Sequence, residues 1–179
     1  MPQTAQIAQE VKDMIRDVID FPKQGIVFKD ITTALKDAET LKKMVDFLCT
    51  NFQGEKIDYI IGLESRGFIF GVPVAYKLDA GFIPIRKPNK LPAKTIKESY
   101  ELEYGTDTLE MHEDALKKGD RVLIVDDLLA TGGTAAAACN LVTRTGADIV
   151  GCAFVIELND LNGRDKLPKD CKVLSMLNY

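Results

Sequence analysis

Apolar side chains near the start of the chain recur at intervals of three and four residues, which is the spacing of one helix face. The pattern includes Ile7, Val11 and Val18 and stops before Phe21-Pro22. A face of this kind packs against a core while the opposite face stays in water. We therefore expect an amphipathic helix over residues 4–19.

A second pattern of the same period lies between Leu41 and Phe52. Asp37 precedes it at the position of a capping residue, and Gly54 follows it where glycine commonly ends a helix. The sequence predicts a second helix here. The stretch between the two helices, residues 21–32, is rich in turn-forming residues and is expected to be irregular.

From Ile57 onward the pattern changes to short apolar runs that alternate with helical segments. Residues 122–125 and 149–156 show no polar alternation, which is typical of strands buried on both faces. Strands that alternate with helices indicate an α/β fold with an open, twisted, mainly parallel sheet flanked by helices. The chain is too short for a closed eight-unit barrel. The segments in order are IDYIIGL, GFIFGVPVAYKL, GFIPIRK, RVLIVDD, TAAAACNLVTR and DIVGCAFVIEL.

The long connection over residues 88–120 does not fit this alternation. Its pieces YELEYG and TLEMHE alternate in polarity on either side of Gly105, which predicts a β-hairpin. Connections of this length are usually lids, binding loops or linkers. Four lysines lie just before this connection or in its first part, and they either serve a binding site or form a solvated face: Lys87, Lys90, Lys94 and Lys97.

Length and charge narrow the class of protein. A chain of 179 residues with 46% hydrophobic content suits one sizeable core, so we expect a single domain over 1–179. Its net charge of -4 provides no basic surface for nucleic acid, and no run is long and apolar enough for a membrane helix. The start lacks the pattern of a secretory signal, so a cytoplasmic protein is expected.

The cysteines do not form a metal-binding or disulfide pattern. They are far apart, without a C-x-x-C pair, and His112 is the single histidine of the sequence. We expect reduced, mostly packed thiols at Cys49, Cys139, Cys152 and Cys171.

The stretch VLIVDDLLATGGT, residues 122–134, combines an acid pair with an anion loop. Asp126 and Asp127 follow a buried strand, at the end where open α/β sheets bind ligands. The glycines of ATGGT allow close backbone approach, and the helix that begins near Thr134 points its N–H groups toward an anion. The P-loop and dinucleotide-binding motifs are both absent from the sequence.

Carboxylates beside a bare phosphate repel it, unless hydroxyls or a cation lie between them. A sugar phosphate meets this condition, because the loop holds the phosphate while the acids accept hydrogen bonds from the sugar. The alternative is that Asp126 and Asp127 merely cap an ordinary strand-to-helix turn.

The same stretch resembles the phosphoribosyl-diphosphate motif of type I phosphoribosyltransferases, and DDLLATGGT is most similar to the members that use adenine. Four further segments match in order, so the resemblance covers nearly the whole chain. They are FPKQGIVFKDIT (21–32, base recognition), GLESRGFIFG (62–71, diphosphate loop), PNKLPAKTIKESYELEYG (88–105, mobile loop) and VIELNDLNGRDKL (155–167, C-terminal segment).

The resemblance implies the type I fold, with a small N-terminal hood over about 1–35 and a flexible hairpin lid over about 88–120. It implies purine salvage by transfer of 5-phosphoribosyl from its 1-diphosphate to N9 of adenine, yielding AMP and diphosphate. The reaction depends on Mg²⁺, held mainly through the diphosphate substrate and without direct protein ligands. A homodimer is expected by the same resemblance.

The resemblance also assigns residues by position. The 5'-phosphate is cradled by Ala130, Thr131, Gly132, Gly133 and Thr134, and the ribose hydroxyls bind Asp126 and Asp127. The diphosphate meets the loop of Glu64, Ser65, Arg66 and Gly67, helped by Lys87 and by Arg86, which in the family can reach a partner subunit. Adenine is bracketed by Val27, Phe28 and Lys29. The expected catalytic residues are Glu103, for the proton on adenine N7 or N9, and Tyr104, Arg66 and Lys87.

The chain departs from the family's commonest pattern at Lys29, Glu64 and Gln24, where arginine, aspartate and proline are frequent. Lysine does not reproduce a bidentate arginine, so base affinity depends on what Lys29 does. Two alternatives remain: a regulator that binds the activated sugar without turnover, and an enzyme for xanthine, guanine or orotate. The segment FPKQGIVFKDI favours adenine.

Overall fold

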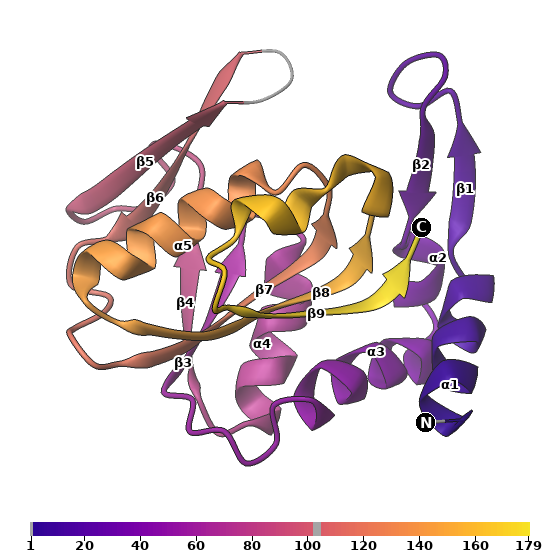
Figure 1. The fold of residues 1–179 in the computed structure, drawn as a ribbon, viewed down its shortest axis with the longest axis horizontal. Coiled ribbons are helices and arrows are strands. Elements are labelled where there is room, and N and C mark those ends of the chain that lie inside the picture. Colours follow the sequence, from indigo (N-terminus) through magenta and orange to yellow (C-terminus); the bar gives the residue numbers. More distant parts are fainter. Residues whose placement is uncertain (1, 102–104) are drawn as a thin grey trace. The chain divides into compact units, whose positions relative to one another are not determined.

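A computed structural model describes residues 2–101 and 105–179 of the protein (Figure 1). The chain separates into two compact units, one ending at Phe47 and the other running from Leu48 to Tyr179. No helix within the described ranges is long and apolar enough to cross a membrane.

The N-terminal unit contains an antiparallel β-ribbon where the sequence predicted the second half of a helix. The first helix ends at Asp13, and β1 pairs with β2 so that Arg16 lies opposite Asp30. The helix predicted over residues 4–19 is therefore wrong beyond Asp13, and residues 21–32 are more regular than predicted. The bounds are α1 Pro2–Asp13, β1 Arg16–Ile19, β2 Val27–Asp30 and α2 Thr32–Leu35; α3 Ala38–Thr50 begins in this unit and ends in the next.

The ribbon is favoured by contacts that a helix would not provide. Arg16 forms an ion pair with Asp30 across the two strands, and the Lys29 ammonium lies 2.8 Å from the carboxylate of Asp17. The β-branched side chains of Val18 and Ile19 also favour extended backbone. Helical spacing alone did not reveal these cross-strand partners.

The predicted cap of the second long helix is confirmed. Oδ1 of Asp37 accepts hydrogen bonds from the backbone N–H of Thr40 at 2.8 Å and from its hydroxyl at 2.6 Å. These bonds satisfy donors that the first turn of a helix leaves open. The helix ends at Thr50, four residues before Gly54, whose φ of +88° places it in a left-handed turn.

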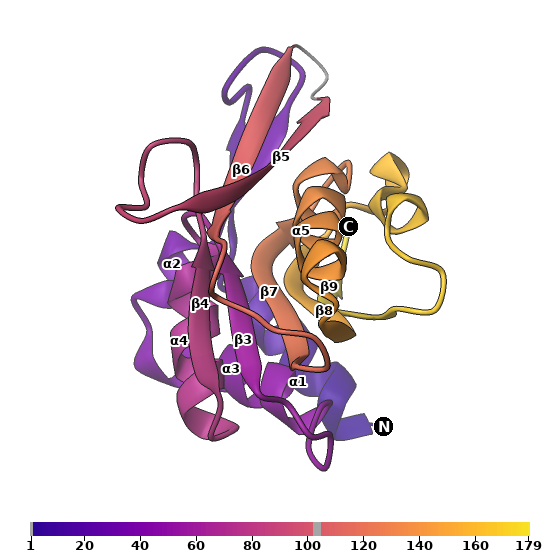
Figure 2. The same cartoon turned by 90° about the vertical axis from the view of Figure 1, so that its left-hand side faces the viewer.

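The second unit is built on a five-stranded sheet in the order β4-β3-β7-β8-β9, with every neighbouring pair parallel. This confirms the predicted open α/β architecture. Figures 1 and 2 show α4 and α5 on opposite faces of the sheet. The bounds are β3 Tyr59–Leu63, α4 Gly67–Lys77, β4 Gly81–Ile85, β7 Arg121–Leu129, α5 Gly133–Thr145, β8 Asp148–Glu157, the 3-10 turns η1 Asn159–Leu161 and η2 Gly163–Lys166, and β9 Lys172–Asn178.

Burial in the core explains why the sequences of the central strands are almost entirely apolar. Ile61 on β3, Ile124 on β7 and Phe154 on β8 are fully buried, and they share one cluster with Ala138 and Leu141 of α5. The alanines of α5 allow the helix to pack closely against the sheet. The predicted thiols are all free, and only Cys171 among the four is partly exposed.

The predicted hairpin is confirmed, with β5 over Thr95–Glu101 and β6 over Thr106–His112. Gly105, at φ +95°, lies in its turn, and the register places Tyr100 opposite Asp107. The hairpin is joined to the sheet by two backbone hydrogen bonds between Arg86 and Glu110 of 2.9 and 2.7 Å. Glu103 and Tyr104 lie outside the described residues.

Candidate functional site

The site lies at the topological switch point of the sheet, where the order in which strands are added reverses. Starting from β3, the chain adds β4 on one side and then β7 on the other, and open α/β sheets bind ligands at such a switch point. Strand β3 pairs with β7 only as far as Gly62 and Val125, whereas β7 continues beside β8 to Leu129. Asp126 and Asp127 therefore stand at the point where β7 loses one neighbour.

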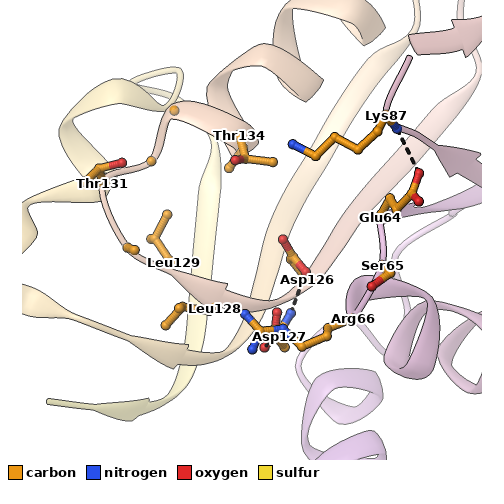
Figure 3. A pocket seen from close by; sticks show the side chains of 14 residues that line it. Glu64, Ser65, Arg66, Lys87, Asp126, Asp127, Leu128, Leu129, Thr131 and Thr134 are labelled. Atoms are coloured by element: carbon orange, nitrogen blue, oxygen red, sulfur yellow. Dashed lines mark hydrogen bonds and ion pairs between the residues drawn. The ribbon is translucent and has the colours of Figure 1, made fainter. Parts of the chain in front are cut away.

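A pocket of about 220 Å³ opens at this point (Figure 3). It brings together most of the residues predicted for the sugar phosphate and the diphosphate. Arg86 is not among the described residues that line it. The lining residues are Glu64, Ser65, Arg66, Lys87, Asp126, Asp127, Leu128, Leu129, Ala130, Thr131, Gly132, Gly133, Thr134 and Ala135.

The glycine loop presents backbone donors to the pocket. Gly132 has a left-handed φ of +78°, and α5 begins at the next residue with neither a side-chain cap nor an acidic residue in its first turn. The N–H groups of that turn therefore lack a side-chain cap, and the helix dipole makes them favourable to an anion. This is the arrangement that a phosphate requires.

The backbone of η2, at Gly163, packs directly against the backbone of the glycine loop. A Cβ atom on Gly132 would lie 2.2 Å from the carbonyl oxygen of Gly163, and a Cβ on Gly163 would lie 2.2 Å from that of Ala130. Both positions therefore require glycine. Gly163 belongs to the segment VIELNDLNGRDKL, whose only signal in the sequence was its resemblance to the family, and it was not predicted to lie at the site.

The two adjacent aspartates are held differently. The carboxylate of Asp127 is 6% exposed and lies 2.9 Å from Nε of Arg66, whereas Oδ1 of Asp126 accepts the backbone N–H of Asp127 at 2.8 Å. Burial raises the pKa of both carboxyls; the charge of Asp127 raises that of Asp126 further, and Arg66 partly offsets the rise at Asp127. Both acids therefore gain from hydroxyl donors or a cation in the pocket.

Glu64 binds protein groups at the edge of the pocket. Its carboxylate accepts two hydrogen bonds from the Arg86 guanidinium, at 3.1 and 3.2 Å, and one from the backbone N–H of Lys87 at 2.8 Å. Burial raises the pKa of Glu64, but these donors outweigh that effect and lower it. Glu64 thus fixes the turn that carries Lys87, while Arg86 is directed to Glu64.

The Lys87 side chain extends across the pocket toward Thr134 (Figure 3). Its ammonium donates to the hydroxyl of Tyr100 at 3.0 Å and forms an ion pair with Asp107. The hydroxyl of Thr134 also donates to Tyr100, at 3.2 Å. Tyr100 and Asp107 were not among the predicted site residues, although the predicted hairpin around Gly105 brings them opposite each other.

The residues predicted to bracket the base lie on β2 in the N-terminal unit. The rings of Phe28 and Phe21 pack edge to face with centroids 5.2 Å apart. Lys29 pairs with Asp17, and Val27 is exposed. Phe28 is only partly buried, so its ring retains surface for a ligand.

The donor set suits a magnesium ion brought by the substrate. Among residues 2–101 and 105–179, no group of three histidine, cysteine, aspartate or glutamate side chains is arranged to hold a metal. Mg²⁺ keeps several waters and commonly binds one or two carboxylates together with substrate phosphates. Asp126 and Asp127 place negative charge beside the proposed diphosphate position, so they would favour such an ion while the diphosphate and water supply its direct ligands.

Comparisons with known proteins agree with this geometry. Residues 32–178 match the family model described as "Phosphoribosyl transferase domain". The chain is 59% identical over 170 residues to the adenine phosphoribosyltransferase of Geotalea uraniireducens, which covers 95% of this chain and 99% of that relative.

Solved structures are similar over the same length. Adenine phosphoribosyltransferase from Rhodothermus marinus superposes with a TM-score of 0.93 at 52% identity, covering 98% of this chain and 99% of that one. The Saccharomyces cerevisiae enzyme, solved with adenine and an imino-altritol bisphosphate, gives 0.90 at 43% identity and covers 96% and 99%.

Proposed function

The chain belongs to the phosphoribosyltransferase family, and we infer that it transfers the 5-phosphoribosyl group of 5-phospho-α-D-ribose 1-diphosphate to N9 of adenine. The products are AMP and diphosphate, and the reaction belongs to purine salvage. The observation that carries this inference is that Asp126 and Asp127 line the same pocket as the glycine loop that precedes α5. Adenine as the base rests on the names of the relatives.

The phosphoribose occupies the pocket along β7 in this proposal. The 5'-phosphate binds the N–H groups of residues 130–134, where α5 begins. The ribose 2'- and 3'-hydroxyls donate to Asp126 and Asp127, which lie immediately before the loop. The acids and the anion loop then hold opposite ends of one molecule, so the repulsion between carboxylates and phosphate is avoided.

The barrier falls when the leaving diphosphate is stabilised. Its departure leaves positive charge on the ribose, as in glycoside hydrolysis. Ser65, Arg66 and Lys87 line the same pocket, and the two cations neutralise charge as it develops on the leaving group. When bound with the substrate, Mg²⁺ supplies further neutralisation of the diphosphate. Exclusion of water protects the activated sugar from hydrolysis.

Base recognition is the part of the proposal that rests on resemblance. Phe28 stacks on adenine, while Val27 and Lys29 bracket it from the N-terminal hood. Glu103 handles the proton on N7 or N9, and Tyr104 closes over the site. The proposal also includes a cytoplasmic homodimer in which Arg86 faces the partner subunit.

An assay of product formation separates this enzyme from a ligand-sensing regulator of the same fold. Purified protein with Mg²⁺, phosphoribosyl diphosphate and adenine is expected to release AMP and diphosphate in equal amounts. A protein that binds phosphoribosyl diphosphate in a calorimeter and forms neither product would be a regulator, and the proposal would fail.

A further inference from the structure

We propose that Tyr100 and Asp107 of the hairpin compete with the substrate's phosphates for Lys87 and Thr134, so that ligand binding must release a hairpin latch. The inference rests on the proposed function, because that function brings phosphates to both partners of the latch. It gives Tyr100 and Asp107 a role that the proposed function does not include, which is to weaken the binding of the phosphate-containing ligand.

The latch is centred on one hydroxyl group. The Tyr100 hydroxyl accepts hydrogen bonds from Lys87 at 3.0 Å and from Thr134 at 3.2 Å, and it donates to Asp107 at 3.2 Å. One donor and two acceptor sites are all that a phenol offers. The hydroxyl is therefore fully used, and both of its donors come from the pocket lining.

Charge makes the competition unavoidable. Among the described residues that line the pocket, the cations are Arg66 and Lys87. Arg66 is paired with Asp127, and Lys87 is paired with Asp107. An incoming diphosphate therefore meets cations that are already neutralised, and it must displace Asp107 to gain the full charge of Lys87.

Displacing Asp107 from Lys87 costs little free energy, because the ion pair between these two side chains is weak. The side chains of Lys87 and Asp107 are 35% and 28% exposed, and solvent screens pairs of this kind. Burial lowers the pKa of Lys87, but the hydrogen bonds from its ammonium to Asp107 and Tyr100 outweigh that effect and raise it. The ammonium thus stays charged, and a diphosphate offers it more negative charge than one carboxylate.

The base of the hairpin stays fixed while its outer part changes partners. Met111 of β6 is fully buried, and α5 holds β5 through Asn140 to Glu98 at 2.9 Å and Arg144 to the carbonyl oxygen of Lys97 at 2.7 Å. Nearer the turn, Tyr100 lies against the phosphate loop, since a Cβ on Gly133 would come within 3.1 Å of its ring. A phosphate that enters the loop therefore meets Tyr100 directly.

The test measures binding of inorganic diphosphate with Mg²⁺ by calorimetry, which needs no adenine and no turnover. Asp107→Asn keeps the shape of the side chain and removes the charge that holds Lys87. We expect the Kd for diphosphate to fall roughly fivefold, the upper range for an exposed ion pair. Asp114→Asn, which removes the same charge from an exposed residue of the same connection, is expected to leave the Kd unchanged.

A double substitution separates the latch from general repulsion between Asp107 and the ligand. In a Lys87→Met background, Asp107→Asn is expected to have no effect on the Kd for diphosphate. An equal gain in both backgrounds would overturn the latch, and so would an unchanged or weaker Kd in Asp107→Asn alone. Failure to form AMP would count against the proposed function and leave this binding result intact.

Discussion

Gly132 and Gly163 meet backbone to backbone, although α5, β8 and η1 lie between them along the chain: a Cβ on Gly132 would lie 2.2 Å from the carbonyl oxygen of Gly163. Gly132 shapes the start of α5, and Gly163 begins η2. The C-terminal segment therefore supports the glycine loop of residues 130–134, which we propose binds the 5'-phosphate.

Gly163→Ala is expected to displace this loop. The added methyl group has no space beside the Ala130 carbonyl oxygen, and overpacking of this kind costs about 1–3 kcal/mol of unfolding free energy. Small displacements of a positioned substrate are costly, so kcat/KM is expected to fall about a hundredfold. Steady-state kinetics and thermal unfolding measure the two effects.

Gly119→Ala is the control for Gly163→Ala. Gly119 has a φ of +86°, so alanine is strained there, but no atom other than its chain neighbours lies within 4 Å of the added Cβ. Lower stability with unchanged kcat/KM is expected. Wild-type activity in Gly163→Ala would refute the supporting role of the C-terminal segment.

Asp126→Asn is expected to stabilise the protein and weaken its binding of phosphoribosyl diphosphate. Asparagine keeps the Oδ1 acceptor for the Asp127 N–H and removes a charge that burial disfavours. At neutral pH the gain in unfolding free energy is expected to be about 0.5–2 kcal/mol, the range of single stabilising substitutions. A variant that is less stable and binds the sugar as before would contradict the role given to Asp126.

The binding of phosphoribosyl diphosphate is expected to tighten as pH rises from acid toward neutral. Burial raises the pKa of Asp126 and Asp127, so these groups take up protons at a higher pH than ordinary aspartates do. The ionised forms accept the ribose hydroxyls, and the protonated forms accept them poorly. Calorimetric titrations across this pH range measure the effect, which Asp126→Asn should reduce.

The same shift affects stability with the opposite sign. Because the folded pKa values exceed the unfolded ones, the folded state binds more protons in the window between them. The contribution of this pair to the free energy of unfolding is therefore full below the unfolded pKa and is lost as pH rises through the folded pKa. Unfolding curves of wild type and Asp126→Asn should diverge with rising pH in favour of the variant.

Glu103→Gln is expected to lower kcat about a hundredfold with little change in the KM for phosphoribosyl diphosphate, because general acid-base groups contribute on that scale. Glu101→Gln, an exposed change on the same hairpin, is the matched control and should be neutral. An unchanged rate in Glu103→Gln would remove Glu103 from the proton transfer.

The elements that sequence predicted well are those whose signal is contiguous. The buried strand, the acid pair and the glycine loop of residues 121–134 follow one another, so pattern alone located the pocket that we propose for the sugar phosphate. The helix predicted through Ile19 was wrong beyond Asp13. The apolar residues of β1 happen to continue the spacing of the helix face, and the residues that favour a strand here lie on β2, outside the local pattern.

Contacts between distant segments could not be predicted from local patterns. The approach of Gly163 to Gly132 depends on how the chain returns after β8, and the contact of Tyr100 with Thr134 depends on how the hairpin lies on α5. Glu64 was predicted to face the diphosphate, and its bonds to Arg86 and Lys87 became visible only in three dimensions.

A panel of bases decides whether the protein is an adenine-specific enzyme. Initial rates of nucleotide formation are measured with Mg²⁺, phosphoribosyl diphosphate and, in separate reactions, adenine, guanine, xanthine and orotate. AMP is expected to form far faster than any other nucleotide. Turnover of guanine, xanthine or orotate without turnover of adenine would refute the proposed function.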